Sequence, residues 1–343
     1  MRKIMSAVAL AAIALSAGPA IGQNAPPPGR GPQADPLDVA ASLPIGSGPY
    51  RAIMEADPGL ATHTIYRPAD LTPLASTKIP IVAWGNGACA NVGNRFRWFL
   101  SEIASYGYLV VAIGPIGPNS AATLGVTPYT PQPSVTGTAA PPAPGAGRGT
   151  PAGGPPQLPP PESHSSQIVD AINWAVAEND RTGSKYYHRL DTKKIAVMGQ
   201  SCGGVQAIEA SADPRVSTSV IWDSGLFPMA SAMGGGKAMS KEDLKLLHAP
   251  TAYISGDDED IAYPNANDDF DKINGIPLFR GYERGVLHTA TYRERDGGEF
   301  GGVAVAWLNW QLKGDKKSAL MFQGANCGLC VNPRWVVRKK SMD

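Results

Sequence analysis

The sequence feature that most constrains the fold is an apolar, strand-like run that ends in a Gly-x-Ser-x-Gly turn. Residues 194–198 lead into Gly199-Gln200-Ser201-Cys202-Gly203, and small and apolar residues suited to a helix follow through Ala210. In such a nucleophile elbow, a sharp turn from strand to helix strains the central residue and exposes its hydroxyl. The helix that follows directs backbone N–H groups at the same point. The pattern therefore predicts Ser201 as a nucleophile.

Segments typical of strands and helices alternate on both sides of this turn. The expected strands are 61–66, 79–84, 108–113, 194–199, 216–222 and 250–255. Helices with one apolar face are expected at 96–103, 165–176 and 301–312. Strands that alternate with helices form parallel sheets with right-handed crossovers. The sequence therefore predicts an α/β fold, with a mostly parallel central sheet flanked by helices.

The first 22 residues have the layout of an export signal. Two basic residues precede an apolar stretch at 4–15, and the small-residue ending Ala20-Ile21-Gly22 follows. The apolar stretch is too short to span a bilayer comfortably, so we expect a cleaved signal peptide at 1–22 and no membrane contact afterwards. A disordered, proline-rich leader is expected at 23–45. The mature protein should be secreted or periplasmic.

The main domain is expected to span 46–320, with a C-terminal appendage at 321–343. Within it, segment 114–161 holds 14 prolines and 9 glycines, and its only charged residue is Arg148. Because this composition offers too few apolar residues for a core element, we expect a flexible insertion. The insertion follows the C-terminal end of a strand, where open α/β sheets bind ligands, so an active-site lid or an adhesive linker is the alternative to a plain surface loop.

Charge and cysteine content narrow the range of partners. Without the signal peptide the chain has 28 basic and 29 acidic residues, and only Arg338-Lys339-Lys340 forms a basic cluster. We therefore expect no nucleic-acid partner. Cys327 and Cys330 lie near the C-terminus without a matching histidine cluster or a βαβ context, which favours a local disulfide over a zinc or redox site. No cofactor or metal is implied, and the oligomeric state stays open.

Four motifs in this order are typical of one superfamily. They are Gly85-Asn86-Gly87 after a strand, the Gly-Gln-Ser-Cys-Gly-Gly elbow, Gly256-Asp257-Asp258-Glu259-Asp260 after another strand, and His288 ahead of the last helix. Over residues 45–320 the chain resembles the α/β-hydrolase superfamily. Within it, the chain is similar to secreted dienelactone-hydrolase-like and polyester-hydrolase (cutinase-type) serine esterases. The resemblance implies an α/β-hydrolase fold and ester hydrolysis.

The resemblance also implies a Ser, acid, His order along the chain. The histidines are His63, His164, His188, His248 and His288. His288 alone follows the acid-bearing turn, so we predict it as the base that activates Ser201. His164, beside the insertion, is a weaker candidate for lining the pocket.

Several acids compete for the third position. Asp257, Asp258, Glu259 and Asp260 crowd one turn, and Asp223 ends the preceding strand, where some lipases carry the acid. Polyester-hydrolase-like relatives place the acid four residues after the turn glycine, with a proline four residues further on. Asp260 and Pro264 match these positions, so the resemblance selects Asp260.

The oxyanion formed during ester cleavage needs two preorganised donors. The first is expected from the backbone N–H of Cys202, directly after the nucleophile. The second is expected from the loop after strand 79–84, where Asn86 aligns best and Gly87 is next. Cys89 in the same loop and Cys202 are expected either to form a disulfide that braces the two sides or to stay buried thiols.

These features predict an exported serine hydrolase that cleaves small-molecule or polymeric esters through an acyl-enzyme on Ser201. An acyltransferase or amidase with the same three residues is the first alternative. A non-catalytic binding protein on the same scaffold is the second.

Overall fold

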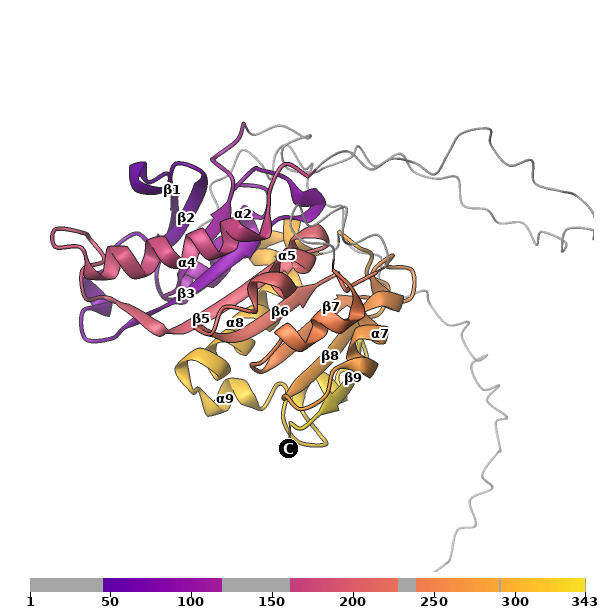
Figure 1. Cartoon of the computed structure of the whole chain (residues 1–343). Helices are drawn as coiled ribbons and strands as arrows, with labels where there is room; N and C mark the ends of the chain where they lie inside the picture. Colours follow the sequence, from indigo (N-terminus) through magenta and orange to yellow (C-terminus); the bar gives the residue numbers. More distant parts are fainter. Residues whose placement is uncertain (1–45, 119–160, 228–238, 290, 343) are drawn as a thin grey trace, which may run out of the picture. The chain divides into compact units, whose positions relative to one another are not determined.

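One mixed sheet organises the described part of the chain, which the computed structural model gives as residues 46–118, 161–227, 239–289 and 291–342 (Figure 1). All of these residues belong to one unit, Pro36–Asp343. The predicted signal peptide at 1–22, the leader at 23–45 and most of the insertion at 114–161 lie outside the described residues. The described part of the insertion is its two ends.

In the described residues the sheet has nine strands in the order β1-β2-β4-β3-β5-β6-β7-β8-β9. The strands are β1 (Ala52–Glu55), β2 (His63–Pro68), β3 (Ile79–Gly85), β4 (Leu109–Ile113), β5 (Leu190–Gln200), β6 (Val216–Trp222), β7 (Thr251–Gly256), β8 (Leu278–Glu283) and β9 (Trp335–Lys340). All pairs from β4 to β8 are parallel, whereas β1, β2 and β9 pair antiparallel with their neighbours. The mostly parallel sheet predicted from the sequence is confirmed.

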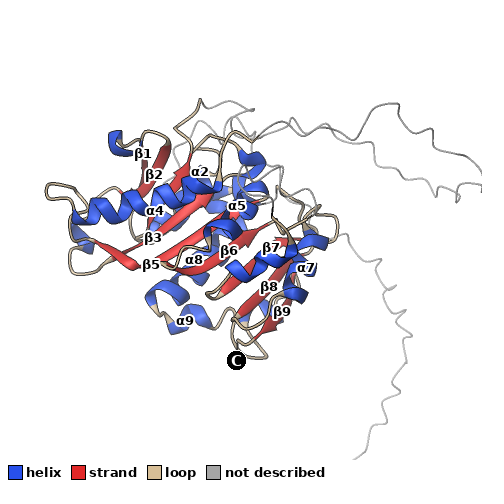
Figure 2. Cartoon of the chain, in the orientation of Figure 1, coloured by secondary structure: helices blue, strands red, loops and turns tan. Residues whose placement is uncertain are grey.

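Helices cover both faces of this sheet (Figure 2). They are α2 (Arg97–Ser105), α4 (Ser165–Asp180), α5 (Cys202–Ala210), α7 (Tyr263–Lys272), α8 (Gly298–Lys313), α9 (Lys316–Ala319) and α10 (Gly328–Val331). Helices α2 and α8 pack on one face, and α4, α5 and α7 pack on the other. No helix in the described part of the chain is both long enough and apolar enough to cross a membrane.

Successive side chains along the central strands point alternately into the two hydrophobic cores, one on each face of the sheet. On β3, Val82 and Trp84 face the core under α2 and α8, while Ile81 and Ala83 face the core under α4 and α5. Strands buried on both faces are apolar at nearly every position, as the β3 sequence is. The burial of both faces fixes the register, so the C-terminal ends of β3, β5, β6 and β7 meet along one edge.

The C-terminal segment 321–343 differs from the expected appendage. Strand β9 extends the sheet by pairing with β8 over six residues, from Leu278 opposite Lys340 to Glu283 opposite Trp335. The side chains of Phe322 and Trp335 are buried in the core that α8 covers. The appendage was expected because the segment follows helix 301–312, which seemed to close the domain, but the charges of the segment suit an edge strand that faces water on one side.

Candidate active site

The elbow at Ser201 joins β5 directly to α5. Ser201 has φ 54° and ψ −119°, angles that a non-glycine residue rarely adopts, and its N–H donates to the Trp222 carbonyl at 2.9 Å. A Cβ on Gly199 would lie 2.1 Å from the Gly203 carbonyl oxygen, and a Cβ on Gly203 would lie 2.1 Å from that of Gly85. Only glycine permits this packing. The local sequence therefore holds the strained serine at the edge where the parallel strands end.

Three predicted site residues form one hydrogen-bonded chain. His288 Nε2 lies 2.9 Å from Ser201 Oγ, and His288 Nδ1 lies 2.7 Å from Asp260 Oδ1. The Asp260 side chain is fully buried, whereas that of His288 is 22% exposed. When Nδ1–H donates to Asp260, Nε2 is left to accept the serine proton. The structure thus brings together residues that are 28 and 87 positions apart in the sequence.

The turn after β7 separates the acids that the sequence left in competition. The Ala262 N–H donates to Asp260 Oδ1 at 2.8 Å, which orients this carboxylate toward His288. Asp257 instead accepts the Gly285 N–H and so ties the turn to the loop that carries His288. Asp258 and Glu259 are exposed. Among these neighbours, Asp260 is the one whose carboxylate contacts His288.

Asp223, the topological alternative, lies behind Asp260 rather than beside His288. Its Oδ1 accepts the Gly256 N–H at 2.9 Å, and its Oδ2 accepts the Tyr292 hydroxyl. Burial raises the pKa of Asp223 well above its usual range, and the nearby Asp260 carboxylate raises it further. Burial alone would raise the pKa of Asp260 as well, but hydrogen bonds from His288, Asp223 and the Ala262 N–H lower it. The pair therefore holds its proton on Asp223.

A protonated Asp223 also accounts for the surroundings of Asp260. Within the described residues, Asp260 Oδ2 is buried and receives no N–H donor. A hydrogen bond between the two carboxyl groups raises the pKa of Asp223 and lowers that of Asp260, as a proton carried by Asp223 requires.

Arg280 is a buried cation in the same region as the two acids. It is fully buried on β8, and its guanidinium donates to Ser255 Oγ, Asn267 Oδ1 and the Gly281 carbonyl. Burial lowers the pKa of Arg280 to about 10, while attraction to Asp223 and Asp260 acts in the opposite direction.

Asn86 lies in the loop after β3, as expected, but its side chain makes hydrogen bonds within the protein. Its Nδ2 donates to the carbonyls of Ala90, Val92 and Ile113, and its Oδ1 accepts from Trp84 Nε1. These bonds shape the loop after β3. Both polar atoms of the Asn86 side chain are therefore already hydrogen-bonded. The donor that we expect Asn86 to give to an oxyanion is its backbone N–H. A Cβ on Gly203, next to the start of α5, would lie only 2.7 Å from that nitrogen.

A disulfide joins the two sides of this expected oxyanion site. Cys89 and Cys202 are bonded, with their Cα atoms 5.2 Å apart, so the disulfide alternative holds and the free-thiol alternative does not. Ser163 and Gln206 reinforce the link, because Ser163 Oγ donates to the Cys89 carbonyl and Gln206 Nε2 donates to the Ser163 carbonyl. The local Cys327–Cys330 disulfide predicted from the sequence is also present.

One residue of the site was not predicted. Gln200 lies inside the elbow motif, and its Nε2 donates to the His288 carbonyl at 2.9 Å. This bond ties the base to the strand that carries the nucleophile. Its position directly before the serine was the available signal, but the partner is 88 residues away and only the fold brings it near.

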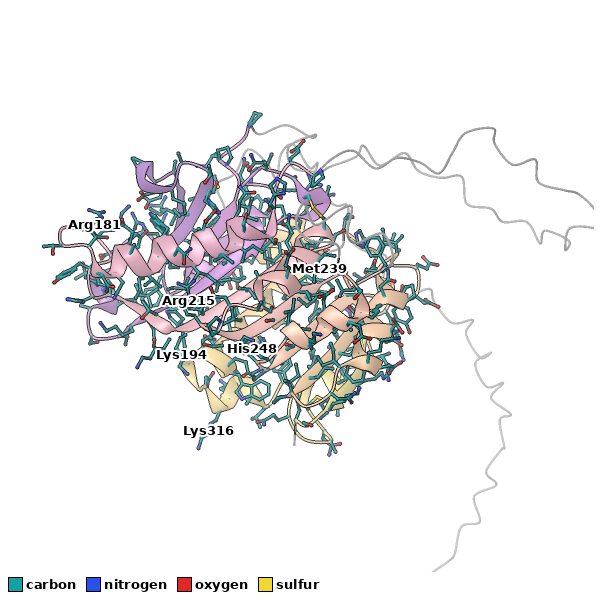
Figure 3. All side chains as sticks on the ribbon, viewed as in Figure 1. Arg181, Lys194, Arg215, Met239, His248 and Lys316 are labelled. Atoms are coloured by element: carbon teal, nitrogen blue, oxygen red, sulfur yellow. A yellow bond between two sulfur atoms is a disulfide. The ribbon has the colours of Figure 1, made fainter. Side chains whose placement is uncertain are left out.

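The other histidines lie on other elements of the fold. His63 is buried against α4, where its Nε2 contacts the Gln167 carbonyl. His164 is exposed at the start of α4, and His188 is exposed ahead of β5. His248 precedes β7 and is seen in Figure 3 near Lys194 and Arg215, toward the ends where the parallel strands begin. In the described ranges, no group of three or more His, Cys, Asp or Glu side chains is arranged to hold a metal ion.

Comparison with known families supports the resemblance seen in the sequence. Residues 156–268, about a third of the chain, match a family described as PET hydrolase-like. The matched region contains Ser201 and Asp260 and ends before His288. No curated protein matches the chain. The chain is thus similar to a family of polyester hydrolases in the region that carries the elbow, and its sheet is of the α/β-hydrolase type.

Proposed function

We propose that the protein is an exported serine hydrolase that cleaves carboxylic esters through an acyl-enzyme on Ser201. The observation that carries this proposal is the chain of hydrogen bonds from Asp260 through His288 to Ser201 at a strained elbow. The match to a PET hydrolase-like family supports an ester substrate, either a small molecule or a polymer. Two disulfides suit an oxidising compartment, which supports export.

In the first half of the proposed reaction, Ser201 Oγ attacks the ester carbonyl carbon while His288 Nε2 takes the hydroxyl proton. The backbone N–H groups of Cys202 and Asn86 stabilise the oxyanion. When the intermediate collapses, the bond to the alcohol oxygen breaks, and His288 gives its proton to the departing alcohol. The acyl group stays on Ser201.

In the second half, His288 takes a proton from water, and the resulting hydroxide attacks the acyl carbon. The bond to Ser201 Oγ then breaks, the serine regains its proton, and a carboxylic acid leaves. Asp260 stays ionised throughout and stabilises the imidazolium that forms in each half. The lowered pKa of Asp260 suits this role.

The direct test replaces Ser201 with alanine. The variant should lose hydrolysis of p-nitrophenyl butyrate by a factor of about 10⁴ or more, because the nucleophile is gone. It should also fail to react with a fluorophosphonate probe, measured by intact mass. Ser166→Ala, at an exposed serine in the first turn of α4, is the control and should keep full activity and labelling. Equal activity in the wild type and Ser201→Ala would exclude the mechanism.

A further inference from the structure

Three parts of the described structure anchor the loop that carries His288. This loop joins β8, which ends at Glu283, to α8, which begins at Gly298. Asp257 in the turn after β7 and Gln200 on β5 each hold the loop by a hydrogen bond to its backbone. The third anchor is the C-terminal segment, whose contacts with the loop suggest a task beyond extending the sheet.

The C-terminal segment holds the start of this loop. The Arg284 N–H donates to the Arg334 carbonyl at 2.8 Å, and Arg284 Nη1 donates to the Pro333 carbonyl at 3.1 Å. Arg284 directly follows β8 and lies four positions before His288. The chain thus leaves β8 toward His288 in contact with residues near its own C-terminus.

The guanidinium group of Arg334 binds a carboxylate at each end of the same loop. Its Nη2 donates to Glu283 Oε1 at the end of β8. Its Nη1 donates to Glu299 Oε1 at 2.9 Å, in the first turn of α8. The Glu283 side chain is fully buried, whereas those of Arg334 and Glu299 are 52% and 38% exposed. We refer to Glu283, Arg334 and Glu299 as the Arg334 bridge.

The chemistry of the Arg334 bridge suits a spacer between two elements. A buried carboxylate such as that of Glu283 is costly without a paired cation, so its bond to Arg334 is hard to give up. The guanidinium group is planar and presents its N–H donors in a rigid fork, which can hold two carboxylates at a fixed separation. One side chain therefore sets the distance between the end of β8 and the start of α8.

The residues beside Arg334 keep its guanidinium group in place. The Arg334 N–H donates to Asn332 Oδ1 at 3.0 Å, just ahead of β9. Trp335, next in sequence, is 4% exposed, and its ring lies against that of Phe300 with centroids 5.9 Å apart. Phe300 is in the first turn of α8, so this packing and the Arg334 bridge hold the same end of the helix. None of these contacts involves the Cys327–Cys330 disulfide.

We propose that Arg334 is a positioning residue for ester hydrolysis. The Arg334 bridge fixes both ends of the loop, and the loop then presents His288 to the serine and the buried acid. The inference rests on the proposed hydrolase function and deepens it. It gives the C-terminal segment a role in catalysis as well as in the sheet.

The leaving group of the ester provides a readout that is specific to His288. An alkoxide such as ethoxide needs a proton from His288 to depart, whereas p-nitrophenolate leaves well without one. Ethyl butyrate and p-nitrophenyl butyrate give the same acyl-enzyme, and kcat/KM covers the steps up to its formation. A displaced His288 should therefore slow the ethyl ester more than the p-nitrophenyl ester. A smaller fraction of folded enzyme would slow both equally.

Arg334→Met removes both ion pairs and keeps the apolar stem. Its kcat/KM should fall about threefold on p-nitrophenyl butyrate and about thirtyfold on ethyl butyrate, because positioned proton transfer contributes roughly 10²–10⁴-fold and the variant loses part of it. Arg338→Met is the matched control, since Arg338 is also on β9, is 44% exposed and pairs with Asp271 instead. The control should keep both values within about twofold. Equal losses on the two esters in Arg334→Met would mean that Arg334 acts only through stability.

Arg334→Lys separates the geometry of the bridge from its charge. A lysine ammonium can still pair with the buried Glu283, but it lacks the fork that reaches Glu299 at the same time. The variant should therefore have a urea midpoint near that of the wild type and an ethyl-to-p-nitrophenyl ratio of kcat/KM lowered about fivefold or more. A full return of both rates would show that one positive charge suffices, which would overturn the proposal.

Glu299→Gln tests the bridge while Glu283 stays paired. The amide keeps the size of the side chain and an acceptor oxygen but loses the charge, so its bond to Arg334 should weaken. The ethyl-to-p-nitrophenyl ratio should then fall about threefold. This variant decides the question if Arg334→Met does not fold, and an unchanged ratio would count against the bridge.

Hydrogen exchange tests the loop without relying on turnover. The N–H groups of Arg284 and Gly285 are hydrogen-bonded, so in Arg334→Met a peptide spanning 284–288 should exchange about tenfold faster or more, measured by mass spectrometry. Arg338→Met should exchange as the wild type does. Serine-dependent hydrolysis with unchanged exchange and an unchanged ester ratio in Arg334→Met would sink the positioning role and leave the hydrolase intact. Faster exchange in a protein whose Ser201→Ala variant is fully active would sink the hydrolase instead, and with it the role of Arg334 in catalysis.

Discussion

Asp223 is a buried carboxyl group that binds its proton more tightly in the folded protein than in the unfolded chain. Its pKa is raised well above the usual range by burial, and an unfolded aspartate titrates near pH 4. Above that pH the unfolded chain releases the proton while the folded chain keeps it. Stability therefore falls as the pH rises from about 4 toward the folded pKa, by at most about 1.4 kcal/mol per pH unit.

Asp223→Asn should remove this dependence and keep the contact with Gly256, whereas the amide nitrogen that replaces Oδ2 cannot accept the Tyr292 hydroxyl. An asparagine amide still accepts the Gly256 N–H and can donate to Asp260 Oδ2. Relative to the wild type, the variant should gain free energy of unfolding as the pH rises from about 5 toward the folded pKa of Asp223, measured by urea denaturation over a series of pH values. Its esterase activity should stay within about threefold, because the neutral amide resembles the protonated acid. A constant difference across this pH range would show that Asp223 is ionised in the folded protein.

Asp260→Asn is the counterpart, and its effect should be on catalysis. The amide cannot stabilise the imidazolium or fix the tautomer of His288, so kcat should fall by roughly 10³–10⁴. The two variants together assign the two acids by esterase kinetics. A severe loss in Asp223→Asn with a mild one in Asp260→Asn would reverse the assignment.

Some residues of the candidate site could be predicted from the sequence more directly than others. The glycines of the elbow specify Ser201 through local sterics, and His288 follows from its place after the acid-bearing turn. Local chemistry alone did not separate Asp260 from Asp257 or Asp258, and only the resemblance to polyester hydrolases chose among them. The contacts of Asp223 with Gly256 and Tyr292 depend on strands β6 and β7 lying side by side. No local pattern contains that information.

The C-terminal elements show how a charged segment can still belong to a sheet. In β9, Trp335 is buried, while Val336, Arg338, Lys339 and Lys340 remain partly or fully accessible. Such a segment lacks the apolar run that marks a central strand, and it follows the helix that was expected to close the domain. Its pairing with β8 joins residues more than 50 positions apart, and tertiary packing decides it.

Two neighbouring residues test whether this segment is part of the core. Phe322 is fully buried, and its ring packs against Phe279, Trp307 and Trp310. Phe322→Ala should lower the free energy of unfolding by about 3–5 kcal/mol through lost burial and the cavity left behind. Leu320→Ala is the control, because that side chain is 67% exposed, and should change it by less than about 0.5 kcal/mol. Equally small changes in urea denaturation would restore the appendage interpretation.

Across the whole molecule, the alternation of strands and helices predicted the parallel sheet because each segment carried its own periodicity. The mixed ends of the sheet were harder to predict. Strand β1 is short and strand β9 is charged. Each one pairs with the backbone N–H and C=O groups that the neighbouring strand would otherwise leave without partners. The insertion at 114–161 was predicted from composition alone, and both its flexibility and its role remain predictions made from the sequence.

The Cys89–Cys202 disulfide should affect the stability of the whole molecule, since it links positions 113 residues apart. In the unfolded chain it closes a long loop, and loop-closure entropy gives a stabilisation of roughly 4–5 kcal/mol at most. Replacing both cysteines with alanine should lower the free energy of unfolding by about this amount. It should also lower kcat, because the bond holds the Asn86 loop against the start of α5.

The second disulfide provides the matched comparison. Cys327 and Cys330 are three positions apart, so the same loop-closure argument gives only about 2 kcal/mol for their double alanine variant. That variant should keep full esterase activity, because the pair lies in the C-terminal segment away from Ser201. Urea denaturation and kcat on p-nitrophenyl butyrate measure both effects in both variants. If alkylation without prior reduction modifies Cys89 and Cys202, the brace is absent in solution. The loop and the helix would then be held by the Asn86, Ser163 and Gln206 hydrogen bonds alone.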